Sequence, residues 1–169
     1  MAEFLRYWMH WPTLDAWMAI PGAWAICETL HFIGLCMLMG LVGLFDLRVL
    51  GMGRGVAPVD LKPLVPWGVF GFALCVLSGG LFVFGMGANI IGGYAYDVIA
   101  TNPWLQWKLL FLALAGINLA GFYVSGMSRA VDRLDANGDA PAMAKMFCGA
   151  SLVLWVGVIV FGRLIPQGL

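Results

Sequence analysis

The sequence predicts an all-α fold, an integral membrane four-helix bundle with an N-terminal interfacial aromatic segment. Hydrophobic residues make up 62% of the chain and charged residues only 11%, a balance typical of membrane domains and not of soluble ones. Four segments are long and apolar enough to cross a bilayer: residues 21–45, 66–88, 103–125 and 141–165. We therefore predict one transmembrane domain that covers residues 1–169.

Each of the four spans begins with a proline. Proline at the first helical position sacrifices no hydrogen bond, because that N–H has no acceptor within the helix, and its fixed φ suits the first turn. These starts are Pro21, Pro66, Pro103 and Pro141. Four similar starts predict four separate helices.

Residues 1–20 are rich in aromatic side chains. They lack a basic region followed by an apolar core and a small-residue cleavage site, so we expect this segment to be retained. Aromatic rings gather at the membrane surface, and the rings here are Phe4, Tyr7, Trp8, Trp11 and Trp17. The pattern predicts an interfacial segment that is broken at Pro12 and carries His10 on its wet face.

The distribution of lysine and arginine predicts the orientation of the chain in the membrane, since short cytoplasmic loops are enriched in these residues. The first and third connections contain most of these residues, namely Arg48, Arg54, Lys62, Arg129, Arg133 and Lys145. The second connection, residues 89–102, contains none. The pattern predicts a multi-pass protein of the bacterial inner (cytoplasmic) membrane with both termini in the periplasm.

Glu28 and His31 lie three residues apart in the first span. Ionisable groups at membrane depth are costly, so they usually face the bundle interior and have partners. Glu28 and His31 would lie about 10 and 15 Å below the outer helix start, and Lys108 about 7 Å below its own. We therefore expect a Glu28–Lys108 ion pair. Two further polar residues are expected to belong to the bundle: Asn118, bonding across it, and Arg163, closing the fourth span.

All four cysteines fall inside predicted spans, where they most simply act as small apolar residues; they are Cys27, Cys36, Cys75 and Cys148. Cys27 stands four residues before His31, so the sulfur and the imidazole could share a helix face and bind a soft metal such as copper. A calcium loop is excluded at residues 135–146, because Ala140 and Met146 occupy the positions that need glycine and glutamate. No nucleotide loop, zinc framework or hydrolase elbow is present.

Several short motifs together resemble an uncharacterised family of small four-helix bacterial membrane proteins. They are the run Glu28-Thr29-Leu30-His31, Gly40, the run Asp46-Leu47-Arg48-Val49-Leu50-Gly51, Pro66-Trp67, residues 78–82, Lys108 and Asn118. The resemblance covers nearly the whole chain and implies the four-helix architecture.

A more distant similarity is to the bacterial four-helix protoporphyrinogen oxidase that binds haem b, and to the membrane domain of copper-resistance proteins. The oxidase family has a histidine in its first helix and a lysine in its third, and His31 and Lys108 match them. Phe45-Asp46-Leu47-Arg48 stands where that oxidase has a proline–arginine pair. The similarity implies a haem site at His31, which would bind the iron, with Glu28 and Lys108 as supports.

Three functions remain open from the sequence. The first is a haem-b-associated redox or electron-transfer protein; with His10 and His31 as its two histidines, the chain excludes a two-haem, four-histidine cytochrome. The second is a copper or small-cation carrier that uses Cys27, Glu28 and His31. The third is a non-catalytic accessory or assembly subunit. The expected partners are the lipid bilayer and a larger membrane redox complex or a second copy of the chain, with no nucleic acid.

Overall fold

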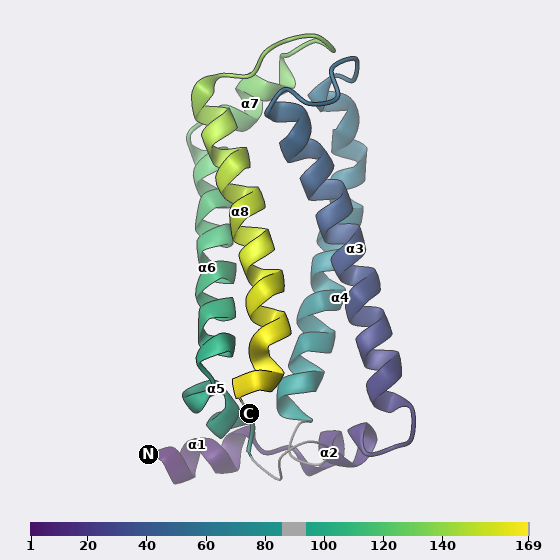
Figure 1. Cartoon of the computed structure of the whole chain (residues 1–169), viewed down its shortest axis with the longest axis vertical. Helices are drawn as coiled ribbons and strands as arrows, with labels where there is room; N and C mark the ends of the chain where they lie inside the picture. Colours follow the sequence, from purple (N-terminus) through teal and green to yellow (C-terminus); the bar gives the residue numbers. More distant parts are fainter. Residues whose placement is uncertain (86–93, 169) are drawn as a thin grey trace.

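The protein is an up-and-down bundle of four long helices in a computed structural model that describes residues 1–85 and 94–168 (Figure 1). The long helices are α3 (Ala23–Val49), α4 (Val65–Phe84), α6 (Pro103–Val124) and α8 (Ala142–Leu164). No strand occurs within the described ranges. Each long helix, with η1 and η3 extending α4 and α8, is long and apolar enough to cross a membrane. The predicted all-α, four-helix membrane fold is therefore confirmed.

The helix starts follow the predicted prolines closely. Pro103 is the first residue of α6, Pro66 lies in the first turn of α4, and Pro141 is the N-cap of α8. Pro21 precedes Gly22, whose φ of +89° turns the chain into α3. The first span was predicted to end at Phe45 but runs four residues further, to Val49. The predicted end of the second span, residues 86–88, lies outside the described residues.

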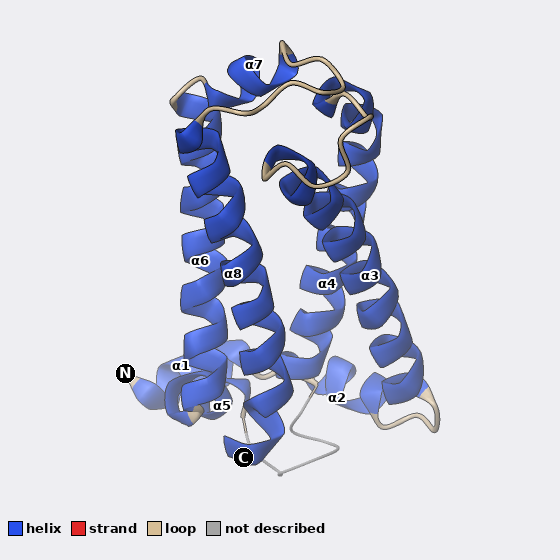
Figure 2. Cartoon of the chain, turned by 45° about the horizontal axis from the view of Figure 1, so that its top comes forward, coloured by secondary structure: helices blue, strands red, loops and turns tan. Residues whose placement is uncertain are grey.

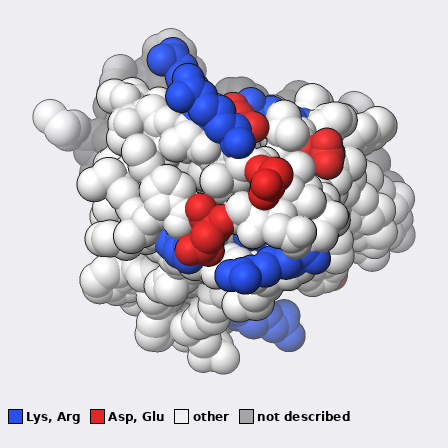
Figure 3. Space-filling view, turned by 90° about the horizontal axis from the view of Figure 1, so that it is seen from above, with Lys and Arg blue, Asp and Glu red and all other residues white. Residues whose placement is uncertain are grey.

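Short helices cover the two ends of the bundle. At the end with both termini, the terminal end, lie α1 (Ala2–Met9), α2 (Pro12–Met18), α5 (Ala95–Thr101) and η3 (Ile165–Gly168). At the opposite end, the loop end, lie η1 (Pro58–Leu64) and α7 (Met127–Asp132). Figure 3 looks down on the loop end and shows lysine, arginine and acidic side chains gathered there. They include the ion pairs Lys62–Asp132, Arg54–Asp139 and Lys145–Asp139.

The N-terminal segment consists of two short helices that separate before Pro12, as predicted. Its aromatic side chains are more than half exposed: Phe4, Tyr7, Trp8, Trp11 and Trp17. Arg6 fastens α1 to α5, because its Nε and Nη2 each donate a hydrogen bond to Asp97 Oδ1 at 2.9 Å. These bonds raise the pKa of Arg6 above its usual value.

The long helices pack as two pairs, α3 with α4 and α6 with α8, and α3 also meets α8. The α3–α4 contact is backbone to backbone: a methyl group added at Gly34 would lie 2.6 Å from the Gly71 carbonyl oxygen. In the other pair, the Phe111 ring fills the space beside Gly157. Figure 2 shows that the two pairs stand apart toward the loop end.

Two buried polar side chains tie the ends of the bundle together. At the loop end, Arg48 is 3% exposed and donates hydrogen bonds to backbone carbonyls of both long connections, at Val56, Asp135, Ala136 and Gly138. At the terminal end, fully buried Asn102 caps α6, and its Nδ2 donates to the Ile165 carbonyl oxygen at 2.9 Å. Arg48 therefore links the first and third connections through their loop carbonyls, and Asn102 supplies partners to N–H groups of the first turn of α6 that have none within the helix.

Candidate functional site

His31 lies on α3 in the terminal half of the bundle, facing α4. Its Nδ1 is 2.8 Å from the Ser78 hydroxyl oxygen. That hydroxyl donates its own hydrogen to the Leu74 carbonyl oxygen one turn earlier in α4. With the Ser78 hydrogen assigned to Leu74, the serine oxygen is the acceptor for His31, and this network assigns the proton of a neutral imidazole to Nδ1. Nε2 then keeps its lone pair.

Flat and small groups surround the imidazole. The ring of Phe82 meets it edge-on at a centroid distance of 5.6 Å. A methyl group added at Gly79 would lie 3.6 Å from His31 Cε1, an ordinary van der Waals contact, so the imidazole lies close to the α4 backbone at this glycine. The site is therefore an oriented imidazole with one nitrogen held and the other available as a ligand.

Lys108 belongs to the same half of the molecule but not to the expected ion pair. Its side chain crosses Gly162 of α8, with Nζ 3.3 Å from the place a methyl group would take there. The expected Glu28–Lys108 ion pair is absent: Glu28 is half-buried, and the structure gives it no salt-bridge partner in residues 1–85 or 94–168. The two residues belong to different helix pairs, because α3, which carries Glu28, packs on α4, and α6, which carries Lys108, packs on α8.

The cysteine thiols near His31 make weak bonds to backbone carbonyls. Cys27 Sγ donates to the Ser78 carbonyl and Cys75 Sγ to the His31 carbonyl, both at 3.5 Å. Among the described residues, no group of three or more histidine, cysteine, aspartate or glutamate side chains could hold a metal ion. The copper alternative at Cys27, Glu28 and His31 therefore has no complete set of protein ligands here.

The remaining two predicted polar residues lie in different surroundings. Asn118 Nδ2 donates to the Phe147 carbonyl oxygen at 3.0 Å, so it bonds from α6 to α8 as expected. Arg163 lies in the last turn of α8 and is exposed, so it does not face the bundle interior. A long cationic side chain near a helix end can extend toward the membrane surface.

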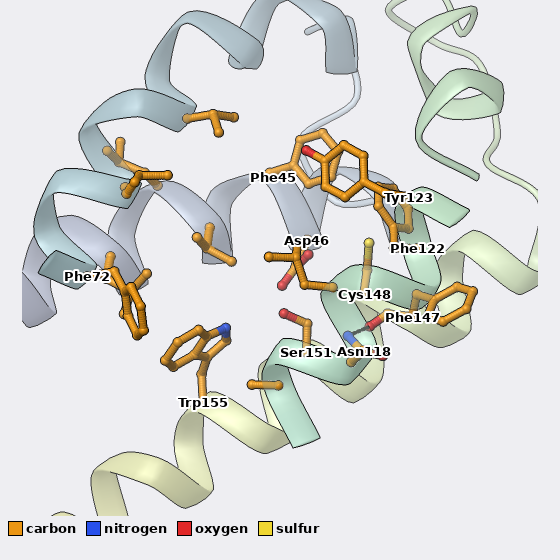
Figure 4. Close-up of a pocket in the computed structure, with 18 of the residues that line it drawn as sticks. Phe45, Asp46, Phe72, Asn118, Phe122, Tyr123, Phe147, Cys148, Ser151 and Trp155 are labelled. Atoms are coloured by element: carbon orange, nitrogen blue, oxygen red, sulfur yellow. Dashed lines mark hydrogen bonds between the residues drawn. The ribbon is translucent and has the colours of Figure 1, made fainter. Parts of the chain in front are cut away.

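A second candidate site occupies the loop half of the bundle, where the two helix pairs stand apart. It is a cavity of about 360 Å³ lined by all four long helices, η1 and α7. Figure 4 shows aromatic rings around it and the carboxylate of Asp46 pointing inward beside Ser151 and Cys148. Asp46 is 4% exposed, and its Oδ2 is a buried oxygen with no hydrogen-bond partner among residues 1–85 and 94–168.

Sequence reasoning assigned no role to Ser78 or Asp46. Both stand in motifs that carried the family resemblance, but Asp46 was expected just beyond the end of a helix. Because α3 continues to Val49, Asp46 lies inside the helix with its side chain in the bundle. The available signal was an aspartate between apolar residues at helical spacing, at Val42, Phe45 and Val49.

The fold and these sites define a class: a polytopic membrane protein built as a four-helix bundle with polar side chains inside it. Comparison with protein-family models, curated proteins and solved structures finds no match to this chain. The choice between functions therefore depends on the geometry of the sites.

Proposed function

We propose that the protein binds haem b through His31 and acts in electron transfer within the bacterial inner membrane. The observation that supports this most directly is the hydrogen bond from His31 Nδ1 to Ser78. It fixes the imidazole and leaves Nε2 free, as in metal-binding histidines whose other nitrogen donates to a neighbouring group. Haem supplies four iron ligands itself, so one protein nitrogen is sufficient where a bare copper ion would need several.

The neighbouring residues fit this group chemically. The Phe82 ring beside the imidazole offers an apolar contact for a flat macrocycle. Lys108 would offer an ammonium group to a haem propionate, or, as the neutral amine, a nitrogen ligand to the iron. When bound, haem would supply the one-electron chemistry. The chain itself would hold the ligand nitrogen in one orientation and keep water away from it.

Absorption spectroscopy tests the proposal. Detergent-purified protein should give a haem-b spectrum that changes on reduction with dithionite, with near-stoichiometric iron. His31→Ala should lose the haem spectrum and the iron. His10→Ala, the matched histidine control, should keep the spectrum and the iron. Ser78→Ala should bind haem about 10- to 100-fold more weakly, because the supporting hydrogen bond is lost.

Three outcomes would contradict the haem site. The first is His31→Ala protein with unchanged absorbance and iron. The second is colourless wild-type protein that contains copper, which would favour the carrier function. The third is protein with neither metal, which would favour the accessory-subunit function.

The lysines and arginines of the two long connections support a cytoplasmic loop end and periplasmic termini. Both termini lie at the same end of the bundle, as this orientation requires. A reporter that is active only in the periplasm, fused after Leu169, should be active. If the reporter is inactive after Leu169 but active when it is inserted at Asn137, in the third connection, the orientation is the opposite one.

A further inference from the structure

We propose that the cavity at Asp46 binds a lipophilic organic ammonium ion, with the charge at the carboxylate and the apolar body among the aromatic rings. This function is separate from the proposed haem site. Asp46 is fifteen residues beyond His31 on α3, which places it about 22 Å further along the helix axis.

The first argument is the unsatisfied carboxylate. A buried polar atom without a partner is uncommon in folded proteins and costs free energy unless something binds it. Asp46 Oδ2 is such an atom. The neutral side chains of Ser151 and Cys148 on α8 interact with the Asp46 carboxyl group, but among the described residues they leave Oδ2 without a hydrogen-bond partner. A ligand that brings its own hydrogen-bond donor would satisfy the carboxylate.

The second argument is charge. Three charged side chains line the cavity in the described part of the chain: Asp46, Lys62 and Asp132. Lys62 and Asp132 form an ion pair with each other at the loop end. Arg48, the cation closest to Asp46 in the sequence, uses its guanidinium on loop carbonyls such as those of Val56 and Ala136. No cation that lines the cavity in the described part of the chain is left to pair with Asp46, so its ionised carboxylate would favour a cation over a neutral ligand.

The third argument is the composition of the walls. Phe45, Phe72, Phe122, Tyr123 and Trp155 line the cavity and surround the carboxylate in Figure 4. Aromatic faces attract ammonium groups and also pack against hydrocarbon. An inorganic cation would need several oxygen ligands. Such a wall instead suits an ammonium on an apolar body.

The fourth argument is access. The cavity is lined on one side by Val65 and Val69 of α4 and on the other by Leu112 and Leu119 of α6. These two helices are not a packed pair: the extensive contacts of the described helices are between α3 and α4 and between α6 and α8. The cavity thus borders the lipid between α4 and α6, where a lipophilic amine partitioned into the bilayer could enter.

The test compares two probes of the same shape, 2-phenylethylammonium and its neutral counterpart 2-phenylethanol. Binding of radiolabelled probe to wild-type protein in lipid nanodiscs is measured against empty nanodiscs, which subtracts partitioning into lipid. The ammonium should bind at least about tenfold more tightly than the alcohol, and Asp46→Asn should remove that difference. Asp60→Asn makes the same charge change on exposed η1, outside the cavity, and should bind like wild type.

A second variant keeps the test decisive if Asp46→Asn fails to fold. Gly116 lines the cavity, and a methyl group added there would meet nothing within 4 Å. Gly116→Leu should therefore fill the cavity, keep Asp46 and lose ammonium binding by about tenfold or more. The proposal is overturned if wild type binds neither probe or binds both equally. It is also overturned if ammonium binding survives both Asp46→Asn and Gly116→Leu.

Discussion

The two helix pairs of the bundle are held together in different ways. In the α3–α4 pair, Gly34 and Gly71 bring the two backbones into contact, as small residues do in many membrane helix pairs. In the α6–α8 pair, the rings of Phe111 and Phe147 occupy the spaces beside Gly157 and Gly121. One pair is therefore in direct backbone contact, and the other is spaced by aromatic rings.

The difference explains where the two candidate sites lie. The close α3–α4 contact sets His31 and Ser78 in hydrogen-bond contact across the pair. The larger cavity lies between the pairs, where Asp46 has no partner of opposite charge. Close packing of α3 and α4 orients the imidazole, whereas the wider separation of the two helix pairs leaves a cavity.

The largest effect should come from Gly71→Ala in the close pair. The added methyl group would lie 2.7 Å from the Gly34 carbonyl oxygen and 2.8 Å from Met37 Cβ, so the helices must separate. We expect a loss of about 3 kcal/mol in the free energy of unfolding, measured by SDS titration in mixed micelles.

Gly80→Ala is the matched control for that variant, because the same methyl group on the same helix meets nothing within 4 Å. It should be neutral or slightly stabilising, since alanine favours helix. Equal stabilities of the two variants would contradict the backbone contact.

Asn102 should give the next largest effect, because it joins α6 to the end of α8. Asn102→Ala removes two bonds to the Trp104 and Leu105 N–H groups and one to the Ile165 carbonyl. The expected cost is about 2 kcal/mol in the same titration. Asn102→Ser keeps a capping oxygen and should cost less, and exposed Thr101→Ala should cost under about 0.5 kcal/mol.

Gly157→Ala should cost less than Gly71→Ala although its clash is closer. The methyl group would lie 2.3 Å from Phe111 ring atoms, but a side chain can move where a backbone cannot. We expect about 1 kcal/mol. The double variant with Phe111→Leu should cost less than the sum of the two single changes. Strict additivity would show that the ring does not set the spacing of α6 and α8.

The smallest effect should come from the exposed loop end. Lys145 donates hydrogen bonds to both carboxylate oxygens of Asp139 and lowers the pKa of Asp139 below its usual 3.8. A lowered folded-state pKa stabilises the protein above the unfolded value, and this contribution disappears as the pH falls through the folded value. Asp139→Asn should therefore slightly flatten the fall of Tm below about pH 4. An unchanged pH profile would show that the pair contributes nothing.

The spans and the places where they begin were predictable because they depend on local properties. Hydropathy marked four apolar segments, and prolines marked where they begin. The break before Pro12 and the cross-helix bond of Asn118 also followed from residue type. The predicted Glu28–Lys108 ion pair was wrong. The depth of each residue along its helix could be read from the sequence, but which helices pack together could not. The position of Asp46 inside the bundle was not predicted, because the end of the first span was placed at Phe45, four residues before the end of α3.

By itself, the sequence determined the four-helix membrane architecture and the presence of a histidine at membrane depth, because apolar length and residue type act within each segment. The tertiary structure decided what those polar groups face. Ser78 orients His31 because two glycines bring α3 against α4. Asp46 faces an aromatic cavity because the helix pairs separate toward the loop end. Both outcomes depend on which helices pack together, and that is a property of the whole bundle.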